Sequence, residues 1–262
     1  MAEIFIEKGD CSWLGKKVTV KIDRPLGTAH PEHPDMIYPV NYGYAEGLTA
    51  GDGEGQDVYI LSVNEPADEA EAVVIAVIER LDDNEDKWVA VPEKLLDTPI
   101  CYECNINRAI EFQEKYYTHI CHALYEKTCG AVMFTERDGR RLYLLIKNDS
   151  GHIGFPKGHV EYGETEYETA VREVREETAL EASPIDGFRM AYSYVNAAGH
   201  RKTAVYFLSH YGCTAAVIQK EEISDSWLLP YDEAIKLLNY PQDIPVLEGA
   251  EKFLNETRKQ FT

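Results

Sequence analysis

Three glutamates that could share one helix face dominate the stretch from Gly154 to Leu180. Glu173, Glu176 and Glu177 stand at positions i, i+3 and i+4, which brings their carboxylates to one side of a helix. Like charges at this spacing cost roughly 0.2–0.5 kcal/mol per pair. A divalent cation bound by the three carboxylates would remove that cost, and Mg²⁺ prefers oxygen ligands. We therefore expect a metal site here.

The residues that flank these glutamates favour a metal site over a solvated acidic helix face. Gly158 ends a Pro-Lys-Gly turn six residues before Glu164. Arg172 follows Glu164 by eight residues, so it can pair with that carboxylate and hold the loop against the helix. Thr165 begins a T-x-x-E capping box, which predicts a helix start. We expect the helix to run to about Thr178.

The elements around this helix predict an α+β chain. Short runs rich in β-branched and aromatic residues fill the first 92 positions, bounded by Gly, Pro, Asp and Asn. Helical spacing follows over 107–127, and strands resume at 128–134. This order predicts two domains, residues 1–122 and 123–262.

The acidic stretch as a whole resembles the Nudix box, G-x5-E-x7-R-E-U-x-E-E-x-G-U, in which U is a bulky aliphatic residue. The matching residues are Gly158, Glu164, Arg172, Glu173, Val174, Glu176, Glu177 and Leu180. Ala179 stands where the family usually has Gly. The resemblance implies a Nudix α/β/α sandwich in the second domain. It also implies hydrolysis of a nucleoside diphosphate linked to another group, with metal bound at Gly158, Glu173, Glu176 and Glu177.

Four stretches around the box resemble the asymmetrical bis(5′-nucleosyl)-tetraphosphatases: "EKTCGAVMF", "GFPKGHVE", "RKTAVYFL" and "EEISDSWLLPYDEA". The resemblance implies a substrate site of cations, a histidine and two tyrosines that stack a base, namely Lys157, Lys202, His159, Tyr194 and Tyr240. Ordinary core packing is the alternative for the two tyrosines. Glu222 matches a late acidic residue that binds metal or acts as the base. His152 is followed by Ile153, where the family often has Trp.

Phosphoanhydride hydrolysis requires neutralised phosphates and an activated water, and metal ions supply both. The expected reaction is therefore Mg²⁺-dependent cleavage of diadenosine tetraphosphate to ATP and AMP, with Mn²⁺ as the other candidate metal. Three alternatives remain open at this stage. The chain could be a broader Nudix enzyme that acts on RNA 5′ ends, a bifunctional enzyme that also hydrolyses pyrophosphate, or a nucleotide sensor without activity.

The stretches "IYPVNYGYAEGLTAGDGEGQDVYIL" and "DDNEDKWVAVP" resemble the soluble inorganic pyrophosphatases, whose fold is a small β-barrel related to the OB type. The resemblance implies a metal and phosphate site at Asp52, Asp57, Asp82, Glu85, Tyr42 and Tyr116. His30 and Tyr117 stand where the family has a phosphate-binding Arg and Lys. These two departures predict a degenerate site that binds metal but hydrolyses pyrophosphate poorly.

The overall composition fits a protein that binds small nucleotides together with a metal. The formal net charge is −20, which argues against a nucleic-acid partner bound through a basic face. No apolar run approaches the roughly 20 residues of a membrane helix, and no secretory signal is evident. The irregular spacing of the six cysteines predicts reduced cytoplasmic thiols. A zinc site is conceivable at Cys101, Cys104, His119, Cys121 and His122, and buried thiols are the alternative.

Overall fold

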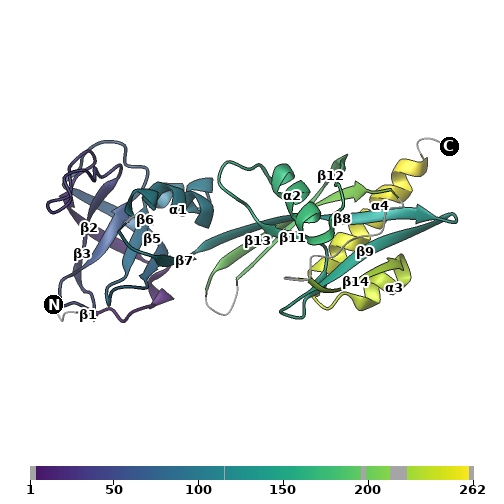
Figure 1. Ribbon diagram of the computed structural model, residues 1–262, viewed down its shortest axis with the longest axis horizontal. Helices are drawn as coiled ribbons and strands as arrows, with labels where there is room; N and C mark the ends of the chain where they lie inside the picture. Colours follow the sequence, from purple (N-terminus) through teal and green to yellow (C-terminus); the bar gives the residue numbers. More distant parts are fainter. Residues whose placement is uncertain (1–3, 115, 196–198, 213–222, 260–262) are drawn as a thin grey trace. The chain divides into compact units, whose positions relative to one another are not determined.

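The computed structural model describes residues 4–114, 116–195, 199–212 and 223–259 (Figure 1). Backbone contacts divide the chain into two compact units. The first contains residues 1–126 and 195–202, and the second contains residues 127–194 and 203–262. Residue 195 and residues 199–202 thus belong with the first unit, a return that the sequence did not predict. No helix among the described residues is long and apolar enough to cross a membrane.

The first unit is built on a closed barrel of five strands. The barrel strands pair in the cyclic order β3–β2–β5–β6–β4–β3. The small β-barrel predicted for this half of the chain is confirmed. The strands of the unit are β1 (Ile4–Phe5), β2 (Lys17–Arg24), β3 (Asn41–Thr49), β4 (Gly55–Ile60), β5 (Glu69–Arg80), β6 (Lys87–Val91) and β7 (His119–Ala123), and its α-helix is α1 (Glu103–Ile110).

Strand β5 carries apolar residues on both faces because each face meets a different part of the core. Val74 and Val77 pack in one cluster with Trp88. Ile75 and Ile78 pack in a second cluster, which also contains Ile106 of α1. A bulge between Val74 and Ala76 shifts the strict alternation of the strand. The almost continuous apolar run of β5 therefore corresponds to a strand that is buried on both faces.

The helix predicted over 107–127 is shorter in the structure. Helix α1 ends at Ile110 and a short 3-10 turn follows at Glu111–Gln113. The segment His119–Ala123 instead forms β7, which pairs antiparallel with β5. Backbone hydrogen bonding to the edge of β5 therefore determines the structure of this segment, although its apolar spacing would also suit a helix.

The second unit is a sheet covered by helices on both faces. Its strands are β8 (Tyr125–Arg137), β9 (Arg140–Asn148), β10 (Ile153–Gly154), β11 (Lys157–His159), β12 (Pro184–Val195), β13 (Arg201–His210) and β14 (Ile223–Pro230). They pair in the order β10–β9–β8–β13–β12, with β11 also on β8 and β14 also on β9. The helices are α2 (Glu166–Thr178), α3 (Tyr231–Leu237) and α4 (Asp243–Lys259).

Alternation along β8 shows how the sheet separates the helices. Ala131 and Met133 pack with Val174 of α2. Val132 and Phe134 pack in a different cluster, which contains residues of α3 and α4 such as Ala234 and Leu247. Successive side chains of a strand point to opposite faces, so α2 lies on one face of the sheet and α3 and α4 lie on the other. The predicted α/β/α sandwich is confirmed.

Helix α2 begins and ends with the local interactions that its sequence predicts. The Thr165 hydroxyl accepts a hydrogen bond from the Glu168 amide at 3.2 Å, and the Glu168 carboxylate accepts one from the Thr165 amide at 2.8 Å. This reciprocal capping box fixes the first turn. Ala179 follows the last turn with φ 52° and ψ 20°, and its amide donates to the Arg175 carbonyl.

Candidate active site

Arg172 of α2 ties together the loop and the helix that carry the acidic residues. Its Nε and Nη2 atoms donate to the two carboxylate oxygens of Glu164 at 2.7 and 2.9 Å. Its Nη1 atom donates to Glu173 at 2.8 Å and to Glu176 at 2.9 Å, and Nη2 also reaches the His159 carbonyl at 2.8 Å. The hydrogen bonds from Arg172 lower the pKa of Glu164 to about 2. The structure thus contains the Glu164–Arg172 pair that the spacing suggested.

The Glu173 carboxylate lies directly on the backbone of β11. A Cβ atom added at Gly158 would come within 2.2 Å of that carboxylate, so the site needs glycine at this position. The Glu173 side chain is only 12% exposed. Burial raises the pKa of Glu173, against the lowering effect of the Arg172 guanidinium. A further positive charge close to this carboxylate would therefore stabilise its ionised form.

Glu177 and Glu176 complete the acidic face at different depths. Glu177 is 8% exposed, and its Oε2 atom accepts a hydrogen bond from the Lys157 amide at 2.8 Å. Glu176 lies at the surface with a side chain that is 48% exposed. Helix α2 therefore presents three carboxylates toward β11. Glu177 is buried against a strand amide, Glu173 lies against Gly158, and Glu176 is open to solvent.

These carboxylates line a pocket of about 540 Å³. The pocket also contains Lys157, Gly158 and His159, so six of the predicted site residues meet there. Its remaining walls were not singled out from the sequence and are Thr128, Asn148, Asp149, Ser150 and Glu161. The run of Asn, Asp, Ser and Gly over 148–151, which begins at the last residue of β9, is a turn signal that could have marked part of this wall.

The residues fit a hard divalent cation. The pocket offers several carboxylate oxygens, which are the ligands that Mg²⁺ prefers. Burial raises the pKa of Glu173, and a bound cation would favour its ionised form. Within the described ranges, no three carboxylate, imidazole or thiol groups converge closely enough to form a site by themselves. Arg172 holds Glu173 and Glu176, so a cation would have to take these two carboxylates over from the guanidinium.

The other predicted substrate residues lie in several places. Lys202 pairs with Glu126 at 2.7 Å within the first unit. Tyr194 and Tyr240 are 37% and 45% exposed, so neither ring is core. The Tyr240 ring lies 4.2 Å from the His152 ring, measured between centroids. Glu222 lies outside the described residues.

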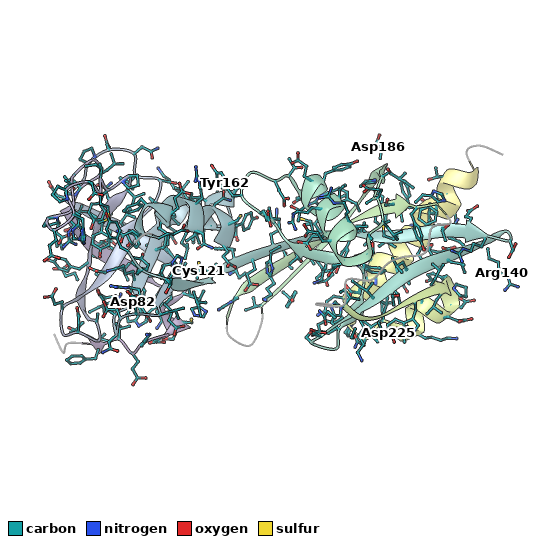
Figure 2. The ribbon with its side chains drawn as sticks, viewed as in Figure 1. Asp82, Cys121, Arg140, Tyr162, Asp186 and Asp225 are labelled. Carbon is teal, nitrogen blue, oxygen red and sulfur yellow. The ribbon has the colours of Figure 1, made fainter. Side chains whose placement is uncertain are left out.

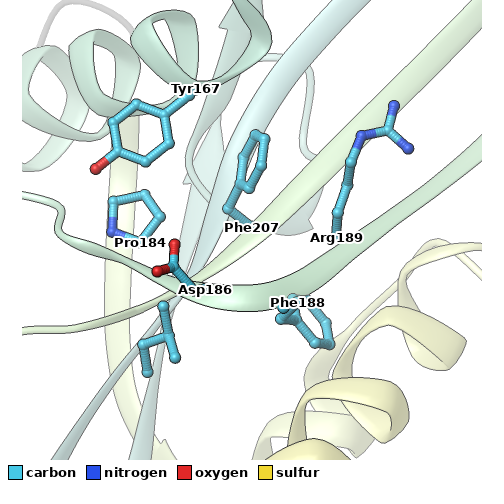
Figure 3. Close-up of a pocket in the computed structure, with 8 residues that line it drawn as sticks. Tyr167, Pro184, Asp186, Phe188, Arg189 and Phe207 are labelled. Atoms are coloured by element: carbon cyan, nitrogen blue, oxygen red, sulfur yellow. The ribbon is translucent and has the colours of Figure 1, made fainter.

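A second pocket of the same unit, of about 320 Å³, lies between α2 and strands β12 and β13 (Figure 3). Tyr167 and Phe207 contact each other edge to face at 6.0 Å on one side of it. Arg189 at its rim forms two hydrogen bonds with Glu166, at 2.7 and 3.0 Å. This pocket contains none of the predicted site residues.

In the first unit, the structure brings together three of the six predicted barrel residues. The Tyr42 hydroxyl donates to Asp57, and Glu85 lies beside them. Lys87 joins this group, with its Nζ atom 2.5 Å from Asp57, 2.9 Å from the Tyr42 hydroxyl and 3.5 Å from Glu85. Burial and the neighbouring Asp57 raise the pKa of Glu85 to about 8. We call Tyr42, Asp57, Glu85 and Lys87 the barrel cluster.

The other three predicted barrel residues lie apart from the barrel cluster's hydrogen bonds. Asp52 accepts a hydrogen bond from the Glu54 amide in an exposed turn. Asp82, labelled in Figure 2, is exposed and pairs with Arg80 at 3.2 Å. The Tyr116 ring packs against His33 at 4.6 Å.

Sequence reasoning missed two cations near the barrel cluster. Lys87 is one of them, and it begins the "KWVAVP" run that carried the resemblance, so the run itself contained the signal. Arg24 is the other, with its guanidinium 5.1 Å from the centre of the Tyr42 ring. The degenerate site predicted from His30 and Tyr117 therefore still has two cations, Lys87 and Arg24.

The cysteine and histidine group does not form a zinc site among the described residues. Cys121 and His122 are neighbours on β7 and so point to opposite faces. His122 instead bonds Glu79 at 2.9 Å, His119 lies 3.5 Å from Asn107, and Cys101 donates to the Leu95 carbonyl.

Comparison with known proteins identifies a family for the second half of the chain. The NUDIX domain model matches residues 125–249. The asymmetrical bis(5′-nucleosyl)-tetraphosphatase of Mus musculus is 33% identical over 151 residues, which cover 50% of this chain and 97% of that protein. This chain belongs to the Nudix hydrolase family. A solved C. elegans Ap4A hydrolase complex is 24% identical and covers 50% of this chain and 98% of its own, with a TM-score of 0.47.

The first unit has a relative of its own. The inorganic pyrophosphatase of Aeropyrum pernix is 39% identical over 82 residues, which cover 30% of this chain and 43% of that protein. The Nudix hydrolase therefore carries a pyrophosphatase-like barrel in the same chain.

The Nudix box of this chain departs from the family pattern at Ala179, which adopts the left-handed conformation that glycine usually provides there.

Proposed function

We propose that this Nudix hydrolase cleaves dinucleoside polyphosphates asymmetrically, and that it converts diadenosine tetraphosphate to ATP and AMP. The observation that carries the proposal is the pocket in which Glu173, Glu176 and Glu177 face Lys157 and His159. Such a pocket combines metal-binding oxygens with a cation that can hold phosphate. The name of the mouse relative adds the substrate class.

Each part of the pocket has a proposed role. The residues that would hold Mg²⁺, or Mn²⁺ in its place, are Glu173, Glu176, Glu177, the Gly158 backbone and Glu222. When bound, the metal supplies neutralisation of phosphate charge and acidification of a water. Lys157 stabilises negative charge on the polyphosphate. A glutamate of this group accepts the proton of the attacking water.

Arg172 and Glu164 have a supporting role in this proposal. The two hydrogen bonds between them fix the guanidinium at the start of the acidic face. The guanidinium in turn orients Glu173 and Glu176 before metal binds. We propose that His159 contacts the phosphates and that the exposed rings of Tyr194 and Tyr240 stack a base. For Lys202, a phosphate-binding role rests on the resemblance alone.

A substrate panel tests the proposal. The full chain with Mg²⁺ would be given diadenosine tetraphosphate, ATP, diadenosine triphosphate and a 5′-triphosphorylated RNA, and products would be separated by anion exchange. We expect the highest kcat/KM for diadenosine tetraphosphate. Higher values for ATP or for the RNA end would establish the broader Nudix enzyme. Tight binding of the dinucleotide without product would establish the sensor.

A second candidate function is pyrophosphate hydrolysis at the barrel. The buried Lys87 amino group beside Asp57 and Tyr42 favours it, because a cation and a carboxylate at one site suit a metal-bound phosphate. Both candidate substrates are small anions that arrive with metal ions. We further propose that the protein acts in the cytoplasm on small nucleotides and not on nucleic acid.

A further inference from the structure

A fully buried carboxylate lies at the start of α4, outside the acidic pocket. Asp243 has no exposed surface. Its Oδ1 atom accepts hydrogen bonds from the hydroxyls of Tyr192 at 2.9 Å and Tyr206 at 3.1 Å, and its Oδ2 atom lies 2.8 Å from Nε2 of His152. Three separate segments of the fold thus converge on one side chain.

Space around Asp243 is tightly restricted. A Cβ atom added at Gly154 would come within 2.8 Å of both the Asp243 Oδ2 atom and the His152 Nε2 atom. Glycine at this position therefore lets the strand pass close to the pair. A buried carboxylate costs free energy unless its hydrogen bonds are satisfied. The three donors satisfy it, but a purely apolar core would avoid the cost altogether.

The contact with Asp243 determines how the His152 ring is held. The tautomer with its proton on Nε2 can donate to Asp243 across this contact, because an ionised carboxylate only accepts hydrogen bonds. The ring is also held against Tyr240, with 4.2 Å between centroids. Asp243 therefore orients this imidazole from its buried side and favours the tautomer with the proton on Nε2.

His152 also belongs to the loop that walls the acidic pocket. Its amide donates to the Asn148 side chain at 3.0 Å, and Asn148, Asp149 and Ser150 line the pocket. Asn239 braces the same loop, because its side chain bonds the Gly151 carbonyl and the Ile153 amide. The connection between α3 and α4 thus holds one wall of the site.

We propose that Asp243 is a positioning residue for the hydrolase site. It fixes His152 as the Nε2–H tautomer and, through His152, holds Tyr240 and the 148–152 loop in the arrangement that receives the nucleotide. This inference rests on the proposed function. Asp243 touches no reacting atom and acts through His152.

Kinetics of Asp243→Asn, His152→Asn and the double variant test this coupling. With diadenosine tetraphosphate and Mg²⁺, we expect Asp243→Asn to raise KM about ten-fold and to change kcat less than about two-fold, because substrate binding is weakened uniformly. If Asp243 acts through His152, the double variant should be no worse than His152→Asn alone. Additive effects would overturn the proposal.

Glu251→Gln is the matched control. Glu251 lies on the same helix and accepts hydrogen bonds from Tyr143 and Arg141, so its replacement perturbs a similar network away from His152. We expect normal KM for this control. An equal rise in KM in Glu251→Gln and Asp243→Asn would show that Asp243 has a structural role only.

A spectroscopic measurement separates this inference from the proposed substrate. Side-chain ¹⁵N spectra of the full chain, with the His152 signal assigned by its loss in His152→Asn, report the tautomer directly. We expect Nε2–H in the wild type and a mixture in Asp243→Asn, together with weaker binding of AMP in that variant. An Nδ1–H wild-type tautomer would overturn the inference. Absence of dinucleotide turnover alongside the expected tautomer would overturn only the proposed function.

Discussion

The Arg172 guanidinium lies beside the acidic face, where a metal cation could also bind. Its guanidinium contacts Glu164, Glu173 and Glu176 at once. Glu164 is bound by two hydrogen bonds, whereas Glu176 shares a single nitrogen with Glu173 and is about half exposed. Metal binding can therefore take Glu176 from Arg172 at small cost while Glu164 keeps the guanidinium in place.

This difference predicts the effect of Glu176→Gln. An exposed ion pair contributes about 0–1 kcal/mol, so the free energy of unfolding without metal should change by less than about 1 kcal/mol. Loss of a group that serves as metal ligand or base should lower kcat by about 10²–10⁴-fold. Urea titration and dinucleotide hydrolysis would be measured in parallel. Normal activity with a large loss of stability would contradict the metal role.

The barrel cluster predicts an unusual dependence of stability on pH. The pKa of Glu85 is raised to about 8 in the folded protein, against about 4.3 in an unfolded chain. The stability that comes from its protonated form is complete below the unfolded pKa and is lost as the pH rises through the folded pKa. Stability of the barrel should therefore fall between about pH 4.5 and pH 8.

Glu85→Gln tests this pH dependence, because Gln mimics the protonated side chain at every pH. The variant should match the wild type near pH 5 and unfold at higher temperature near pH 8. Tryptophan fluorescence can follow the melt, since the Trp13 and Trp88 rings pack together in the first unit, with 5.1 Å between centroids. A constant difference between the two proteins from pH 5 to pH 8 would show that Glu85 does not titrate in this range.

At the level of single residues, sequence predicted those parts of the site that depend on spacing along one helix. Glu164 and Arg172 pair as expected because the capped loop and two turns of α2 fix their separation. Lys87 and Asp243 were beyond such reasoning. Their partners lie 30 and 91 residues away, so spacing within one element could not show these contacts, although the "KWVAVP" run did contain a signal for Lys87.

At the level of elements, α2 combines a strong start with a strained end. Its capping box is complete, but Ala179 holds φ 52° where the family has glycine. A left-handed conformation costs an L-residue roughly 1–2 kcal/mol. Glycine avoids this cost, but its unfolded chain has greater conformational entropy, which offsets part of the gain in stability.

Ala179→Gly should therefore stabilise the second unit by about 0.5–1 kcal/mol. Hydrogen exchange of peptides from α2 would measure the change. Ala191→Gly in the exposed part of β12 is the matched control, and it should destabilise, since glycine weakens a strand. Destabilisation by both substitutions would show that the turn after α2 is not strained.

The sequence predicted most of the elements correctly, and its main failure has a clear cause. Patterns within one segment identified α2 and the strand that resumes at 128–134, which lies within β8. The segment His119–Ala123 was assigned to a helix because its apolar spacing allows one. Its pairing with β5 depends on an edge that lies about 40 residues earlier in the chain, and no local pattern contains that information.

At the scale of the whole molecule, two units with candidate phosphate chemistry share one chain. Their activities can be separated in the intact protein. In a Glu176→Gln background, phosphate released from inorganic pyrophosphate must come from the barrel. We expect such release to persist in Glu176→Gln and to be lost when Lys87→Met is added, because the buried cation beside Asp57 is removed.

Lys94→Met is the control for the pyrophosphate experiment, since it removes a lysine of the same unit outside the barrel cluster. Thermal melts would verify that each variant is folded. No phosphate release from the wild-type chain under any Mg²⁺ or Mn²⁺ concentration would contradict the second candidate function and restore the degenerate barrel predicted from His30 and Tyr117.

The central claim is that the acidic pocket of α2 hydrolyses a dinucleoside polyphosphate asymmetrically with a divalent metal. Its most direct test is the identity of the products from diadenosine tetraphosphate, followed by anion exchange at early times with the full chain and Mg²⁺. We expect ATP and AMP in equal amounts, with no turnover after chelation of the metal. Two molecules of ADP as the product, or undiminished turnover after chelation, would contradict it.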